Sequence, residues 1–236
     1  MKDMKVKRLI EMAKPTEAHM SSVWYHGVPF EDRAKWTMEH GITPRNMASK
    51  SRKAMLAPVE GMVYITRSLR YAAIYAVGGD MFGGVLPKAW LKNDPYGYLF
   101  VVNGSQLRDV QPDEDGVGEL LSIMIRDEER GGGSRNDQYQ NNLDDVAWLY
   151  EFAEERLTRG EWKKVGDGEY TYWAVAGKKL IPNMTDEQKV SLINAGCHVA
   201  HGGILVPDQV WRINKRKNVY LKTDASNFFD VAERIK

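Results

Sequence analysis

The sequence predicts an α+β fold, in which short strands form the core and helices flank it. Three runs rich in aromatic and β-branched residues, at 23–26, 62–65 and 98–102, predict strands. Apolar residues spaced three or four apart predict helices between and after these runs. The hydrophobic fraction of 43% is enough to bury a core without metals or disulfides. We therefore expect one domain over residues 1–236, with a helical or loop insertion at about 126–160.

Six helices are expected from apolar periodicity and from end signals. Pro15 ends the first helix and Gly41 closes the second, while Thr66 or Ser68 caps the third. Thr185, with a glutamine three residues later, forms a capping box for the fifth. The expected ranges are 6–13, 30–41, 69–76, 143–160, 185–196 and 227–235.

The second half of the chain is expected to return to strands after a polar interruption. Residues 169–175, 197–213 and 218–222 are rich in aromatic and β-branched residues, which predicts strands. Residues 126–142 are charged, glycine-rich and polar, and predict a disordered loop. Residues 112–115 predict an acidic turn, and 43–60 a mobile loop.

Composition narrows the class of protein. Lys plus Arg (33) against Asp plus Glu (32) leaves a net charge of +1, which argues against a dedicated nucleic-acid coat protein. Cys197 is the single cysteine, so no internal disulfide forms. The first residues are charged, and nowhere do about eighteen apolar residues run together. We expect a cytoplasmic protein that does not interact with a membrane.

Three segments, taken in order, suggest a function. The first is Trp24-Tyr25-His26-Gly27, followed by a helix that runs to a Gly-Ile-Thr-Pro turn at 41–44. The second is a strand that carries Tyr64, followed eleven residues later by Tyr75 on a helix. The third is the strand at 98–102, which leads into the acidic residues 113–115.

This order resembles the diphtheria-toxin and poly(ADP-ribose) polymerase branch of the ADP-ribosyltransferases, over roughly residues 23–115. Members of that branch have a Tyr-His-Gly strand end, a helix running to a Gly-Leu/Ile turn, a strand with a tyrosine, and a helix with another. The resemblance implies a split, mostly antiparallel β-sheet core with flanking helices. It also implies that NAD binds in the cleft between the sheet halves and is consumed as a substrate. The expected activity is mono-ADP-ribosylation of a macromolecular acceptor, either protein or nucleic acid.

The chemistry of NAD cleavage requires groups of the kinds that these residues supply. Cleaving NAD separates a ribose carbon from a pyridinium nitrogen through a transition state with oxocarbenium character. Tyr64 and Tyr75 would sandwich the flat cationic ring. Gly27 would let the backbone reach the carboxamide, and His26 would offer a ring nitrogen to a ribose hydroxyl. The resemblance adds two more residues to the NAD-binding set, Tyr25 and Tyr71.

The remaining requirement is a carboxylate that stabilises the developing positive charge. The family places a glutamate at the start of a late strand, and His198 stands at that point here. Either Glu114 or Glu169 serves instead, or the group has been replaced. We choose Glu114, because it follows a strand that we expect to neighbour the strand of Tyr64. The expected catalytic residues are therefore His26, Tyr64, Glu114 and His198.

Simpler interpretations exist for each of these features. His26 alone is typical of a strand-end histidine bonded to a carbonyl, and the tyrosines are typical of core residues. His198 and His201 lie three apart without further ligands, so no metal site is expected. The basic run from Arg212 to Lys217 indicates a solvated hairpin turn, or, with Trp211 and Tyr220, a surface that follows a phosphate backbone.

Two rival functions remain at this point. One is a related RNA 2′-phosphotransferase, which also consumes NAD and needs a basic phosphate pocket. The other is a catalytically silent binding module of the same fold. By analogy alone, the size of the chain suggests a toxin–antitoxin, phage-defence or phage-encoded effector, with an antitoxin or inhibitor protein as a further partner.

Overall fold

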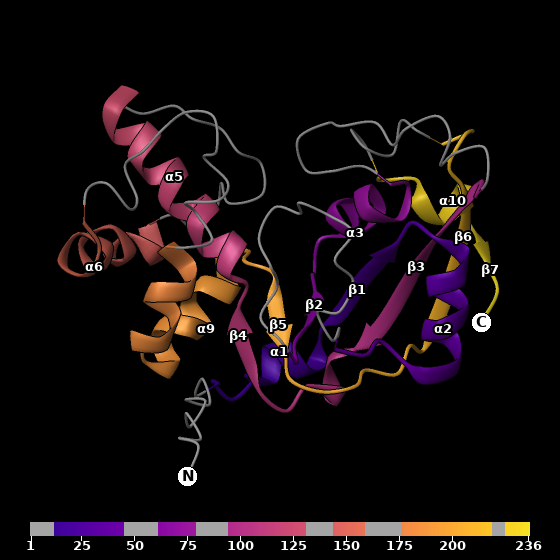
Figure 1. The fold of residues 1–236 in the computed structure, drawn as a ribbon, viewed down its shortest axis with the longest axis horizontal. Coiled ribbons are helices and arrows are strands. Elements are labelled where there is room, and N and C mark those ends of the chain that lie inside the picture. The colour runs from indigo at the N-terminus through magenta and orange to yellow at the C-terminus, as the bar shows by residue number, and fades with distance from the viewer. Residues whose placement is uncertain (1–11, 45–60, 79–93, 131–143, 159–175, 219–224) are drawn as a thin grey trace, which may run out of the picture.

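The computed structural model describes residues 12–44, 61–78, 94–130, 144–158, 176–218 and 225–236. Within them the protein consists of two antiparallel sheets and flanking helices, so the α+β class is confirmed (Figure 1). The strands expected at 169–175 and 219–222, and the greater part of the two expected loops, lie outside the described residues.

The larger sheet has four strands in the order β1-β3-β6-β7. Each neighbouring pair is antiparallel, and Tyr25 lies opposite Val101 in the pairing of β1 with β3. Alternate residues of β3 face opposite sides, as the period of a strand requires. Phe100 packs in the core between the sheets, whereas Leu99 packs beneath α3. The strands are β1 (Val23–Val28), β3 (Tyr96–Asn103), β6 (Gln209–Asn214) and β7 (Glu233–Arg234).

The smaller sheet has three strands in the order β2-β5-β4, also antiparallel. It joins the larger sheet where Tyr25 and Thr66 exchange two backbone hydrogen bonds of 2.7 and 3.0 Å. The two sheets are therefore linked at the residue that precedes His26. The strands are β2 (Val63–Ile65), β4 (Val110–Pro112) and β5 (Val199–His201).

The helices gather in two groups (Figure 1). The helices α2 and α3 lie against the larger sheet, while α5, α6 and α9 pack together beside the smaller one. Their bounds are α1 (Glu17–Ser21), α2 (Glu31–His40), α3 (Leu69–Ala76), α5 (Glu114–Arg130), α6 (Trp148–Arg156), α9 (Asp186–Asn194) and α10 (Phe228–Val231). Single 3₁₀ turns occupy Gly104–Gln106, Asp144–Val146 and Ile181–Asn183.

The prediction of an acidic turn at 112–115 was wrong, and so was the prediction that a loop begins at residue 126. Glu114 is the first residue of the seventeen-residue helix α5, which continues to Arg130. Asp113 caps this helix, because its Oδ1 accepts the backbone N–H of Asp115 at 3.2 Å. The apolar face of α5 packs in the helical core, and the residues at 126–130 are mostly good helix formers that extend it.

Both ends of the chain also differ from expectation. Ala13 forms an isolated bridge with Val110 instead of ending a helix, and residues 6–10 lie outside the described ranges. The last helix ends at Val231, and Glu233–Arg234 pairs with β6. Pairing satisfies backbone groups along β6 that a longer helix would leave exposed.

Candidate functional site

A cavity of about 630 Å³ lies where β1, β2, α2, α3 and the start of α5 meet. Small-molecule sites commonly fall in this size range. Seven of the predicted site residues lie at this cavity: Tyr25, His26, Gly27, Tyr64, Tyr75, Glu114 and His198. Tyr71 does not line it, but its ring lies edge-on against that of His198, with centroids 4.8 Å apart. We call this cavity the central pocket.

His26 has a defined orientation in the central pocket. Its Nδ1 lies 2.8 Å from the backbone carbonyl oxygen of Tyr64. A carbonyl only accepts, so Nδ1 carries the proton in this bond. In the neutral ring, Nε2 is then an acceptor. His26 is thus a histidine near the end of a strand that is bonded to a carbonyl, as its simpler interpretation predicted. The same bond makes Nε2 the nitrogen that can accept a hydrogen bond.

Tyr64 connects β2 to the start of α5. Its hydroxyl donates to Oε1 of Glu114 at 2.9 Å, and the Glu114 side chain is only 2% exposed. The expectation that the strand at 98–102 neighbours the strand of Tyr64 was wrong, because it is β3 of the larger sheet, whereas Tyr64 lies on β2 of the smaller one. The strand directly before Glu114 is β4, and β5 lies between it and β2. Glu114 reaches the central pocket from the first turn of α5 instead. A buried carboxylate held by a phenol is an arrangement suited to stabilising positive charge.

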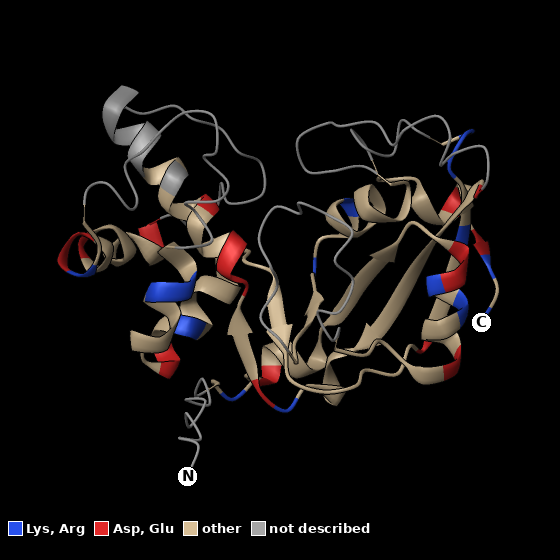
Figure 2. Ribbon diagram, in the orientation of Figure 1, with Lys and Arg blue, Asp and Glu red and all other residues tan. Residues whose placement is uncertain are grey.

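Two further carboxyl groups flank Glu114 at the start of α5, where Figure 2 shows acidic residues beside the smaller sheet. Burial, and then the charges of Asp115 and Glu114, raise the pKa of Asp113 well above its usual range. Burial, and then the charge of Glu114, raise the pKa of Asp115 to about 7. Both groups therefore hold their protons more tightly than an exposed aspartate does.

His198 precedes β5 and is buried in the wall of the central pocket. Its backbone carbonyl accepts the N–H of Asp113 at 2.7 Å, so it lies beside the cap of α5. The side chain is 8% exposed, and neither ring nitrogen has a hydrogen-bond partner among the residues that the structure describes. Burial lowers the pKa of His198 to about 4, so the imidazole is neutral at physiological pH.

Gly27 is explained by packing. A Cβ at this position would collide with the carbonyl oxygen of Ala72 in α3 and would crowd the backbone of Ala76. A glycine at this point of β1 therefore allows α3 to approach the larger sheet closely. We expected this glycine to give a ligand access to the backbone, whereas the observed close contact is between α3 and β1.

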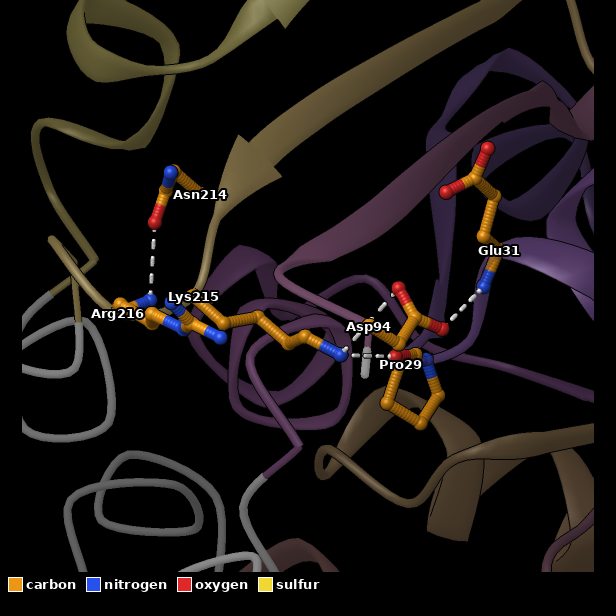
Figure 3. Close-up of polar contacts among 6 residues, drawn as sticks. All are labelled: Pro29, Glu31, Asp94, Asn214, Lys215 and Arg216. Carbon is orange, nitrogen blue, oxygen red and sulfur yellow. Dashed lines mark hydrogen bonds and ion pairs between the residues drawn. The ribbon is translucent and has the colours of Figure 1, made fainter. Parts of the chain in front are cut away.

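A buried lysine fixes the wall of the central pocket that follows β1. Lys215 is fully buried, and its Nζ donates to the carbonyl of Pro29 at 2.5 Å (Figure 3). The same Nζ lies 3.9 Å from Oδ1 of Asp94, whose Oδ2 accepts the first backbone N–H of α2, that of Glu31, at 2.7 Å. The cation thus connects the end of β6 to the connection between β1 and α2. Pro29 and Phe30 in this connection line the central pocket.

Other predicted site features lie elsewhere. Arg212 pairs with Glu233 at 2.6 Å, and Lys215 is buried, so these two do not form a basic surface for a phosphate backbone.

His201 donates its Nδ1–H to the backbone carbonyl of Asp109. Glu169 and Tyr220 lie outside the described residues.

Four pocket residues on α2 are not among those predicted from the sequence: Asp32, Arg33, Trp36 and Thr37. Of the apolar positions by which that helix was recognised, Ala34 is buried whereas Met38 is exposed, and these pocket residues lie at other positions of the helix. Trp36 is 56% exposed and stacks on His40, with ring centroids 3.8 Å apart. The signal in the sequence that could have located this wall of the pocket is Trp36, a tryptophan that does not fall on the apolar positions of the helix.

In the part of the chain that the structure describes, no group of three or more His, Cys, Asp and Glu side chains is arranged to hold a metal ion. Among the same residues, no helix combines the length and the apolar character needed to cross a membrane. Comparison of the chain with protein-family models, curated proteins and solved structures found no match.

Proposed function

We propose that this protein is an NAD-dependent mono-ADP-ribosyltransferase that uses the central pocket. The observation that carries the proposal is the hydrogen bond from Tyr64 to the buried carboxylate of Glu114, in a pocket that also holds His26 and Tyr75. The three ordered sequence segments thus converge on one cavity. Convergence of residues that are far apart in the sequence supports a common task.

The chemistry of the lining suits the cationic end of NAD. Tyr64 and Tyr75 offer electron-rich faces to a flat pyridinium ring. Glu114 and Asp115 lie at the same cavity, and the negative charge that they carry when ionised favours positive charge there. His26 presents an acceptor nitrogen, set by its bond to the carbonyl of Tyr64, which suits a ribose hydroxyl.

The proposed reaction breaks one bond and forms another at the same ribose carbon. The bond from C1′ to the nicotinamide nitrogen breaks, and its electron pair leaves with nicotinamide. A bond forms from C1′ to a nucleophilic atom of a protein or nucleic-acid acceptor, which loses a proton. Glu114 stabilises the positive charge that develops on the ribose, and Tyr64 holds that carboxylate in place.

The test is release of nicotinamide from NAD, with and without cell protein and RNA, followed by mass spectrometry of both fractions. The wild-type chain should release nicotinamide and add ADP-ribose to one fraction. Tyr64→Phe keeps the ring but loses the hydroxyl that holds Glu114, so release should fall about tenfold, the equivalent of one hydrogen bond.

The rival functions give different results in the same experiment. A silent binding module releases no nicotinamide with any fraction, which would refute the proposal. An RNA 2′-phosphotransferase releases nicotinamide only with 2′-phosphorylated RNA and leaves no ADP-ribose on the acceptor.

A further inference from the structure

Residues 176–180 are helical and lie against the start of α5. A Cβ on Gly177 would stand 2.1 Å from the carbonyl oxygen of Glu114 and 2.8 Å from its Cα. Both are main-chain atoms, so they cannot turn aside as the end of a flexible side chain can. Gly177 does not adopt a left-handed φ, so the close approach alone requires a glycine at this position.

The close contact falls on the residue whose carboxylate reaches the central pocket. Tyr64 on β2 holds that carboxylate, because its hydroxyl donates to Oε1 of Glu114 at 2.9 Å. The residue before Glu114 is held as well, because the N–H of Asp113 donates to the carbonyl of His198 at 2.7 Å. Gly177 meets the main chain of Glu114 itself. The position of the carboxylate therefore depends on contacts from β2, from the residue before β5 and from Gly177.

The segment that carries Gly177 is anchored in the core of the helical group. Ala176 and Leu180, on either side of the glycine, are buried in the same hydrophobic cluster as Leu120 of α5. Protein cores are close-packed, so this segment cannot move away from α5 without opening the core. A side chain at position 177 would therefore act on the main chain of Glu114.

We propose that Gly177 is a positioning residue for Glu114, and that its lack of a side chain sets where the carboxylate stands in the central pocket. The inference rests on the proposed function, in which this carboxylate stabilises charge on the ribose. A Cβ at 2.1 Å must move out to at least 3.0 Å, so one of the two main chains must shift by about 1 Å. A shift of about 1 Å in a catalytic group costs about a hundredfold in rate.

The first test compares two substitutions that create the same collision in different places. In Gly104→Ala, the new Cβ would stand 2.1 Å from the carbonyl oxygen of His19, and Gly104 does not line the central pocket. Both variants should therefore lose stability to a similar degree. For nicotinamide release, kcat of Gly177→Ala should fall about 10- to 100-fold, with KM for NAD nearly unchanged. Per folded molecule, Gly104→Ala should keep kcat within about twofold of wild type.

The second test asks whether the loss of activity passes through Glu114. In a Glu114→Gln background, Gly177→Ala should lower kcat by less than about a further twofold, because the charge that it displaces is already absent. A companion measurement needs no turnover. Tyr64→Phe should lower the urea midpoint of unfolding in wild type, and by less than about half as much in Gly177→Ala, where the bond to Glu114 is already distorted.

A second pair of variants decides the question if Gly177→Ala does not fold. Leu180→Ala loosens the segment around Gly177, whereas Leu149→Ala opens the same hydrophobic cluster on α6. Per folded molecule, kcat of Leu180→Ala should be at least about fivefold lower than that of Leu149→Ala. Equal kcat values in the two leucine variants would overturn the inference.

The outcomes separate this inference from the proposed function. The inference is overturned while the function stands if Gly177→Ala and Gly104→Ala keep the same kcat. The same holds if Gly177→Ala causes its full loss in the Glu114→Gln background. If wild type releases no nicotinamide, the proposed function is wrong. The Tyr64→Phe midpoints then decide whether Gly177 sets the position of Glu114, and equal losses in the two backgrounds would show that it does not.

Discussion

Two buried polar clusters of this protein are built in opposite ways. Around Lys215, charges of opposite sign meet: the ammonium bonds to the carbonyl of Pro29 and faces Asp94, which caps α2. At the start of α5, three carboxyl groups lie side by side, next to the imidazole of His198, which lacks a hydrogen-bond partner in the described part of the chain. The first cluster brings opposite charges together, although Oδ1 of Asp94 has no hydrogen-bond partner in the described part of the chain, and the second brings carboxyl groups together.

Under the proposed function, the Lys215 cluster serves stability and the start of α5 serves binding. Removing one partner of a buried charge pair is destabilising because it leaves the other charge buried alone, whereas carboxyl groups that repel one another lower stability while they are ionised. A site that must accept a cationic ligand has the reverse need, and proteins commonly give up stability at such sites. Substitutions in the two clusters should therefore change stability in opposite directions.

Lys215→Met should show the largest effect on stability. It leaves the carbonyl of Pro29 without this donor and Asp94 without its buried cation. The free energy of unfolding, measured with urea, should fall by about 2–3 kcal/mol. The control is Lys35→Met, which removes an exposed ion pair with Glu31 on α2 and should cost under about 0.5 kcal/mol. Equally small losses of unfolding free energy in both variants would show that the buried Lys215 cluster contributes no more to stability than an exposed ion pair.

Asp115→Asn should change the free energy of unfolding in the opposite direction, by raising it. Because burial and Glu114 raise the pKa of Asp115 to about 7, the folded state binds its proton more tightly than the unfolded state. The free energy of unfolding therefore falls as pH rises from about 4 to about 7, and the penalty is complete above pH 7. Removing the charge should raise stability by about 1–2 kcal/mol at pH 8.

The pH dependence of the stability gained in Asp115→Asn tests whether the charge of this carboxylate is the cause. The gain should shrink as pH falls from 7 towards 4, and it is measured by urea unfolding across this range. Asp230→Asn changes an exposed carboxylate on α10 and should show no such trend. A loss of stability in Asp115→Asn at pH 8 would show that this carboxylate stabilises the fold, and that the two clusters do not differ in this way.

The two buried histidines at the ends of β5 offer a smaller and closely matched contrast. His198→Leu removes a ring without a hydrogen-bond partner in the described structure, so stability should stay equal or rise by up to about 1 kcal/mol. His201→Leu removes a ring that donates to the carbonyl of Asp109 at 2.9 Å, so stability should fall by about 1–2 kcal/mol. Thermal unfolding of both variants measures this contrast, and equal losses would contradict it.

Local signals in the sequence located many of the elements that surround the central pocket. The aromatic and β-branched runs became β1, β2 and β3, and apolar spacing with Ser68 and Thr185 as caps located α3 and α9. These features depend on neighbouring residues, so a single sequence contains them. The presence of β5 between β2 and β4 depends on pairing between distant segments, and local patterns do not encode it.

The helix α5 shows why local signals also misled. Acidic residues after Pro112 are typical of a turn, yet the same residues cap a helix and complement its dipole. The choice of Glu114 named a residue that reaches the central pocket, although the route proposed for it was wrong. The isolation of the His198 ring arises only when α3, α5 and β5 come together, so the sequence could not reveal it.

The most direct test of this account is the rate of nicotinamide release by Glu114→Gln. Glutamine keeps the shape and hydrogen-bonding capacity of Glu114 but removes the charge that should stabilise the ribose in the transition state. Release from NAD should fall by about a hundredfold or more, while Glu151→Gln, an exposed control on α6, should match wild type. Unchanged release by Glu114→Gln, with loss in Glu169→Gln or His198→Ala, would contradict the account and assign the catalytic charge to another part of the chain.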